Sequence, residues 1–214
     1  MDSEKSKKPS IPSSWRSMVG TDMYMSLLDA HGEIEVQRQE VIWELRTEET
    51  MFVERLSSVV SLFIIPLRVH ATKTWIAGVP LEIAKVLDWL EDIVNLHTEI
   101  RDTLQSSQTL ECPLAGVSQA EDCGGTRVAY ALRSFVPRLE IYQPYLVKLS
   151  NISEMLRRLV KDSESDFGEF VRIQEKTLER RVSFANMLLE PAERVATYPD
   201  LFRVSVSLDY LSFD

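Results

Sequence analysis

Apolar residues recur at steps of three or four between about residue 35 and residue 65, and this periodicity constrains the fold more than any other feature of the sequence. A half-buried β-strand would alternate apolar and polar residues instead, so the pattern predicts one long amphipathic helix. Pro66 ends the pattern, as expected of a residue that cannot donate a backbone hydrogen bond. The apolar positions of this helix are Val41, Leu45, Phe52, Leu56, Val59 and Phe63.

The rest of the chain repeats this helical spacing in shorter segments. A second helix is predicted from about Leu81 to Leu104, directly after Pro80, and a loop rich in Ser, Gln, Cys and Gly follows at residues 105–126. Helical spacing returns after this loop and continues to Phe202. The 214 residues contain only seven glycines, which also favours helix over sheet. The sequence therefore predicts an all-α fold, an elongated helical bundle.

Length and pattern together set the expected domain boundaries. A chain of 214 residues is long enough for one sizeable core and short for two domains. Residues 1–20 carry almost no apolar run, so they are predicted to be a disordered tail, and residues 21–203 are predicted to form the domain. Residues 204–214 largely alternate apolar and polar side chains, which predicts an irregular C-terminal tail outside the bundle.

Charge and hydropathy argue against several classes of function. The net charge of -9 disfavours a nucleic-acid partner, because a protein that binds phosphates needs a surplus of basic residues. The longest apolar stretch, residues 59–67, falls short of the roughly 20 residues that span a bilayer, so no membrane span is expected. Residues 1–20 lack the apolar segment of a secretory signal, so the predicted localisation is cytoplasmic. Cys112 and Cys123 are then better interpreted as free thiols than as a disulfide or a zinc site.

The sequence carries no motif for covalent catalysis. No phosphate-binding P-loop, glycine-rich dinucleotide turn, HExxH helix or GxSxG turn occurs. His31, His70 and His97 stand apart from one another, which favours surface or loop positions over metal ligands. We therefore expect no catalytic residue, no metal site and no cofactor.

Two carboxylates of the first helix stand out by their position around its axis. At about 100° per residue from Val41, the apolar face runs from about 0° to about 140°, and Glu49 falls inside it at about 80°. A carboxylate there must be paired or hydrogen-bonded, either as a structural group or in a direct binding role, and the structural role is favoured. Glu44 falls at about 300°, on a mixed flank with Met51 and Arg55, where a solvated side chain is the simpler interpretation.

Three segments resemble the signature regions of Dbl homology domains, in the order in which the family has them. Residues 38–53, RQEVIWELRTEETMFV, resemble the first region, whose pattern is R…VI.EL..TE..YV. Residues 128–132 and 139–145, VAYAL and LEIYQPY, resemble the second region. Residues 188–202, LLEPAERVATYPDLF, resemble the third, written L.KP.QR...YPLLL in the family. Three ordered matches that extend from residue 38 to residue 202 are more specific together than any one alone.

The resemblance implies both a fold and a function. Dbl homology domains are elongated helical bundles that bind Rho-family small GTPases and promote the release of GDP without covalent chemistry. Their first and third signature regions form the groove for the partner, and Glu44 occupies the position whose carboxylate engages the first switch region of the GTPase. On this basis Glu44, Glu49, Glu190 and Arg194 are the candidate GTPase-binding residues. Exchange is then a linkage, because a module that binds the nucleotide-free GTPase best must lower its affinity for nucleotide.

Departures from the family pattern keep a second function open. Glu190 stands where the family has a lysine that contacts the second switch region, and Glu193 replaces the glutamine before Arg194. The chain is also expected to be truncated, without part of the last helix and without a pleckstrin homology domain, so that any membrane recruitment would come through other proteins. These features favour weak exchange, or the alternative of a non-catalytic helical interaction module, either a degenerate exchange domain or an adaptor.

Overall fold

Helices form nearly all the regular structure in the computed structural model, which describes residues 14–70, 72–106, 132–178 and 182–211. Within these residues the only β-type feature is one isolated bridge in the connection after the first long helix. The all-α prediction is therefore confirmed. In chain order the α-helices are α1 (Trp15–Val19), α2 (Thr21–Val59), α3 (Leu81–Ser106), α5 (Tyr142–Lys161), α6 (Asp166–Thr177), α7 (Phe184–Met187) and α8 (Glu190–Leu211).

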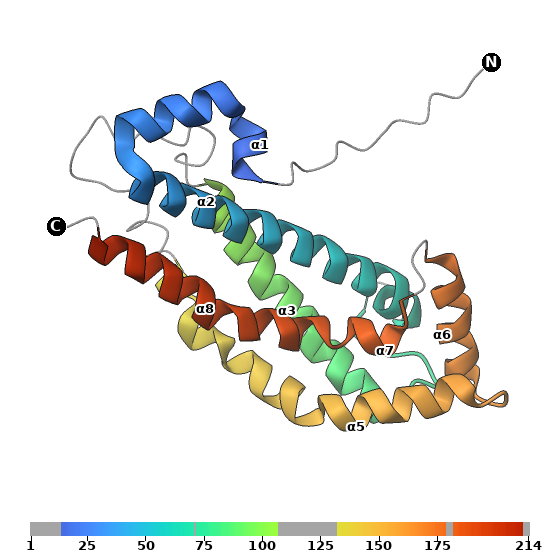
Figure 1. Cartoon of the computed structure of the whole chain (residues 1–214). Helices are drawn as coiled ribbons and strands as arrows, with labels where there is room; N and C mark the ends of the chain where they lie inside the picture. Colours follow the sequence, from blue (N-terminus) through green and yellow to red (C-terminus); the bar gives the residue numbers. More distant parts are fainter. Residues whose placement is uncertain (1–13, 71, 107–131, 179–181, 212–214) are drawn as a thin grey trace, which may run out of the picture.

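The long helices pack side by side into an elongated bundle (Figure 1). Helix α2 packs against α3 and α8, α3 packs against α5, and α5 packs against α6 at one end of the bundle. The predicted long first helix is confirmed, and it ends as expected at Pro66, after a π-helical turn (Val60–Ile64) and within a 3-10 turn (Ile65–Leu67). Helix α3 matches the second predicted helix, and the loop predicted after it falls mostly outside the described residues.

Two clusters of buried apolar side chains form the core. The larger cluster fills the end of the bundle near α6 and includes Phe52, Leu90 and Tyr142. The smaller cluster lies farther along α2 and α3, and includes Leu45 and Tyr198. Because both clusters draw residues from α2 and α3, these two helices connect the whole length of the bundle.

The predicted disordered tail at residues 1–20 is wrong for its last residues. Ser14 caps helix α1 by accepting a hydrogen bond from the amide of Ser17. Trp15 is buried, and its ring meets that of Tyr24 edge to face with 5.9 Å between centroids. Gly32, with a φ of 81°, breaks α2 so that its first turns fold back with α1. Composition missed this hairpin because one tryptophan and one capping serine form no apolar run; residues 1–13 lie outside the described part.

The predicted irregular tail at residues 204–214 is also wrong, because α8 continues to Leu211. Residues 200–211 contain no glycine or proline that would stop a helix. Extending an existing helix avoids the cost of nucleation, and β-branched residues lower helix stability by less than about 0.7 kcal/mol each. The alternation of apolar and polar residues was therefore too weak a signal to end α8.

The helical stretch from Thr21 to Leu67 is long and apolar enough, by length and composition alone, to cross a membrane, with a mean hydropathy of 1.5 in its most apolar window. Its side chains Phe52, Leu56 and Phe63 belong to the larger core cluster, where they pack with side chains from α3 and α5. A helix that supplies the core of a bundle passes the same test of composition. The absence of a membrane span therefore stays a prediction.

Candidate functional site

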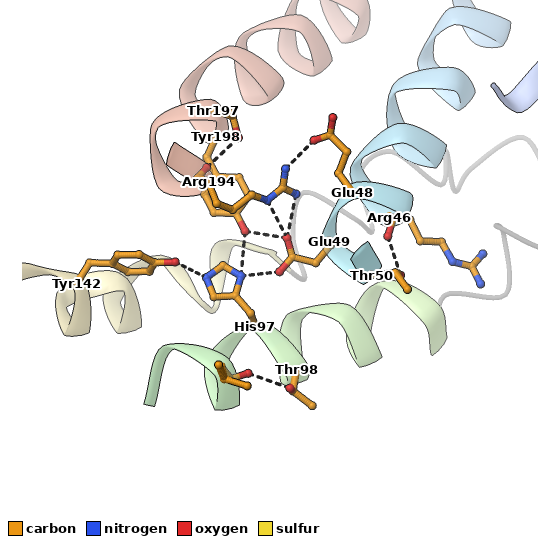
Figure 2. A network of polar contacts seen from close by, with 11 residues as sticks. Arg46, Glu48, Glu49, Thr50, His97, Thr98, Tyr142, Arg194, Thr197 and Tyr198 are labelled. Carbon is orange, nitrogen blue, oxygen red and sulfur yellow. Dashed lines mark hydrogen bonds and ion pairs between the residues drawn. The ribbon is translucent and has the colours of Figure 1, made fainter. Parts of the chain in front are cut away.

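A network of buried polar side chains lies where the two apolar clusters meet (Figure 2). Glu49 comes from α2, His97 from α3, Tyr142 from α5, and Arg194 and Tyr198 from α8. Tyr142 belongs to the larger cluster and Tyr198 to the smaller one, so the network joins the two. Four helices thus contribute to a single set of contacts.

Glu49 lies at the centre of this network. Its Oε2 atom accepts hydrogen bonds from Arg194 Nη2 at 2.9 Å, from Arg194 Nε at 3.3 Å and from the Tyr198 hydroxyl at 2.9 Å. Its Oε1 atom lies 2.5 Å from His97 Nδ1. The prediction that Glu49 is buried and paired, with an arginine or a backbone donor, is confirmed, since Glu49 is 0% exposed and Arg194 is its ion-pair partner.

His97 connects the carboxylate to α5. A carboxylate only accepts hydrogen bonds, so His97 Nδ1 carries the proton in the contact with Glu49. Nε2 can then accept from the Tyr142 hydroxyl, whose oxygen lies 2.7 Å away. Phe52 packs edge to face on the His97 ring, with 4.8 Å between centroids. The imidazole is therefore fixed on both nitrogens and on its face.

Burial and neighbouring charges shift the pKa values within the network. Burial raises the pKa of Glu49, but the hydrogen bond from His97 and the charge and hydrogen bond of Arg194 outweigh it, so this pKa is lowered. Burial lowers the pKa of Arg194, while Tyr198 and Glu49 raise it to a larger total extent. Burial first, and the charge of Glu49 second, raise the pKa of both Tyr142 and Tyr198. At neutral pH the network thus holds an ionised Glu49, a charged Arg194 and two protonated phenols.

These positions bear on two of the sequence-based expectations. Glu49 and Arg194 are candidate GTPase-binding residues, and both side chains are buried against neighbouring helices. They tie α2 to α8, and a contact of either residue with a GTPase stays a prediction. His97 was expected at the surface or in a loop, and it is fully buried. His97 lies three residues after Val94 and three before Ile100, on the apolar face of α3. This spacing was the sequence signal for its burial.

Glu44 lies on the exposed flank of α2, four residues before Glu48, which pairs with Arg194 of α8. Met51 and Arg55 lie farther along the same flank, and both are exposed. Arg55 Nε donates to Glu190 Oε2 at 2.7 Å, so the first residue of α8 is paired across the gap between the two helices. Of the four candidate residues, Glu44 and Glu190 thus lie on one accessible flank, formed by α2 and the start of α8.

Possible metal ligands do not cluster in the described part of the chain. No group of three or more His, Cys, Asp or Glu side chains among the described residues could hold a metal ion. Cys112 and Cys123 lie outside the described residues, so their predicted state as free thiols stays a prediction.

The architecture is an elongated helical bundle whose first long helix packs along its last one. The family model of the RhoGEF domain matches residues 41–205, which include nearly half of α2, all of α3, α5, α6 and α7, and most of α8. The chain therefore belongs to the RhoGEF domain family, the Dbl homology domains, whose members are exchange factors for small GTPases. No curated protein and no solved structure matches the chain.

Proposed function

We propose that this chain binds a Rho-family small GTPase along the flank of α2 and α8 and promotes the release of GDP. The observation that carries the proposal is the family match over residues 41–205, combined with the exposed position of Glu44 on α2, the helix that packs against α8. Glu44 has an accessible carboxylate, and the neighbouring buried network keeps its helix in place.

The chemistry required is differential binding. A GTPase with its nucleotide removed binds this flank more tightly than the loaded form does, so binding of the exchange factor lowers the affinity for GDP by the same factor. A carboxylate on a rigid helix suits this task, because Glu44 can bond the backbone or a cationic group of the partner without first becoming ordered. No covalent bond changes in the exchange factor.

A nucleotide-release assay tests the proposal directly. The chain is incubated with each member of a panel of Rho-family GTPases loaded with fluorescent GDP, and the release rate is compared with that of the GTPase alone. We expect acceleration for at least one GTPase. Glu44→Ala should lose most of this acceleration, because the variant lacks the carboxylate that contacts the partner. Its fold should stay intact, because an exposed carboxylate contributes little to the core. Asp92→Ala, which removes an exposed carboxylate from α3, is the matched control and should keep the rate. Equal rates for both variants would exclude the role of Glu44.

The alternative is an interaction module that binds a GTPase without accelerating release. Glu190 supports it, because the family lysine expected at this position is replaced by a carboxylate that is engaged with Arg55. The same assay separates the two functions when binding to the nucleotide-free GTPase is measured in parallel. Binding without acceleration for the whole panel would favour the interaction module.

The cytoplasmic localisation and the recruitment to membranes through other proteins stay predictions.

A further inference from the structure

A groove lies beside the exposed flank of α2, between that helix and the described residues Thr177, Leu178, Val182, Met187 and Glu190. Its volume is about 600 Å³, within the range of sites that bind a partner group or a small ligand. Buried and half-buried apolar side chains form its floor, and the exposed Met51 together with polar side chains forms its rim. The floor residues are Val59, Leu62, Leu178, Val182 and Met187, and the rim residues are Met51, Glu54, Arg55, Ser58, Thr177 and Glu190.

The groove continues the surface on which Glu44 lies. Around the axis of α2, Glu44, Met51, Arg55 and Ser58 fall within about 60° of one another. Ser58 lies fourteen residues after Glu44, which corresponds to about 21 Å along the helix. A partner that contacts Glu44 and lies along α2 therefore reaches the mouth of the groove without turning around the helix.

Charge at the rim limits what can enter. Glu54 and Glu190 provide two carboxylates, and Arg55 provides one guanidinium, which is already paired with Glu190. The rim is therefore slightly acidic above an apolar floor. A complementary group is an apolar side chain that has a basic neighbour, because the apolar part would displace water from the floor while the cation would meet Glu54.

We infer that this groove is a second subsite of the GTPase-binding surface, which accepts an apolar side chain of the GTPase next to a basic one. The inference rests on the proposed function, and it extends the binding surface from Glu44 to the end of α6 and the start of α8. It also makes Thr177, the last residue of α6, and Leu178, directly after it, determinants of which GTPase is bound. Burial of an anchor side chain in such a groove is where binding energy concentrates in protein interfaces.

Two adjacent serines provide the test. Ser58→Phe places a ring in the groove, whereas Ser57→Phe places the same ring about 100° away on α2, also at an exposed position and outside the groove. Affinity for each nucleotide-free Rho-family GTPase is measured for the unmodified chain and both variants, with thermal unfolding recorded in parallel. For the GTPase bound most tightly, we expect Ser58→Phe to weaken binding about tenfold or more and Ser57→Phe to leave it within about twofold.

Thr177→Phe, which fills the groove from the opposite wall, should repeat the loss and replaces Ser58→Phe if that variant does not fold. Equal affinity for the groove-filling variants and Ser57→Phe would overturn the inference while leaving the proposed function intact. A change in self-association, seen by size-exclusion chromatography, without a change in GTPase affinity would assign the groove to a second copy of the chain and would also overturn it. Failure of the unmodified chain to bind any GTPase of the panel would remove the proposed function and this inference together.

Discussion

Two of the ion pairs that join α2 to α8 differ mainly in burial. Arg194 and Glu49 are 7% and 0% exposed, whereas Arg55 and Glu190 are 51% and 25% exposed. Removal of one partner from the buried pair leaves a charge in the core, but water can solvate either partner of the exposed pair. The comparison teaches that the same two helices have one contact that fixes their packing and another that can change with little cost to the fold.

The largest expected effect comes from breaking the buried pair. Arg194→Ala should lower the free energy of unfolding by about 3–5 kcal/mol, because Glu49 would stay buried without its cation. Denaturant unfolding followed by circular dichroism measures the change. Arg138→Ala is the control, since it breaks an exposed pair with Glu99 and should cost less than about 1 kcal/mol. A loss for Arg194→Ala no greater than that of the control would show that the network is not structural.

The second-largest effect should come from acid, which weakens the buried pair of Arg194 and Glu49. The pKa of Glu49 is lower in the folded chain than in the unfolded one, so its stabilising contribution is complete above the unfolded value of about 4.3. That contribution is lost as the pH falls through the lower, folded pKa. The free energy of unfolding is measured from neutral to acid pH for the unmodified chain and for Glu49→Gln. Below the unfolded pKa of about 4.3, it should fall less steeply with decreasing pH for Glu49→Gln than for the unmodified chain. Parallel curves for the two proteins would contradict the lowered pKa of Glu49.

Apolar periodicity was enough to predict the long helices and the burial of Glu49, because the phase of a helix determines which side chains face the core. It also contained the signal for His97, which the search for isolated metal ligands passed over. It could not identify Arg55 as the partner of Glu190, since these residues are separated by 135 positions and meet only through the antiparallel packing of α2 on α8. Helix α1 depends on the buried Trp15 and the capping residue Ser14, and composition alone could not predict it.

A smaller effect should come from the outer contact of the network. Tyr142→Phe removes the hydroxyl that meets His97 Nε2 and leaves a buried ring nitrogen without that partner, which should cost about 1–2 kcal/mol. The comparison variant is Tyr24→Phe, which removes a partly exposed hydrogen bond to Glu40 and should cost less than about 0.5 kcal/mol. Both are measured by denaturant unfolding. Equal values would mean that Tyr142 is not an effective part of the network.

The exposed pair should give the smallest change in stability and the clearest change in function. Glu190→Lys would place a second cation beside Arg55, so it should cost at most about 1 kcal/mol and leave GDP release no faster than before. The combined change Arg55→Glu and Glu190→Lys reverses the pair, keeps its attraction, and presents the family's lysine at the start of α8. If this position contacts the GTPase, the double variant should accelerate release above both the unmodified chain and Glu190→Lys, in the assay that tests Glu44→Ala. Arg55→Glu alone is the control, because it brings two carboxylates together and adds no cation. Identical release rates for all four proteins would show that the exposed pair lies outside the GTPase contact, and that α2 and α8 meet the partner only near Glu44.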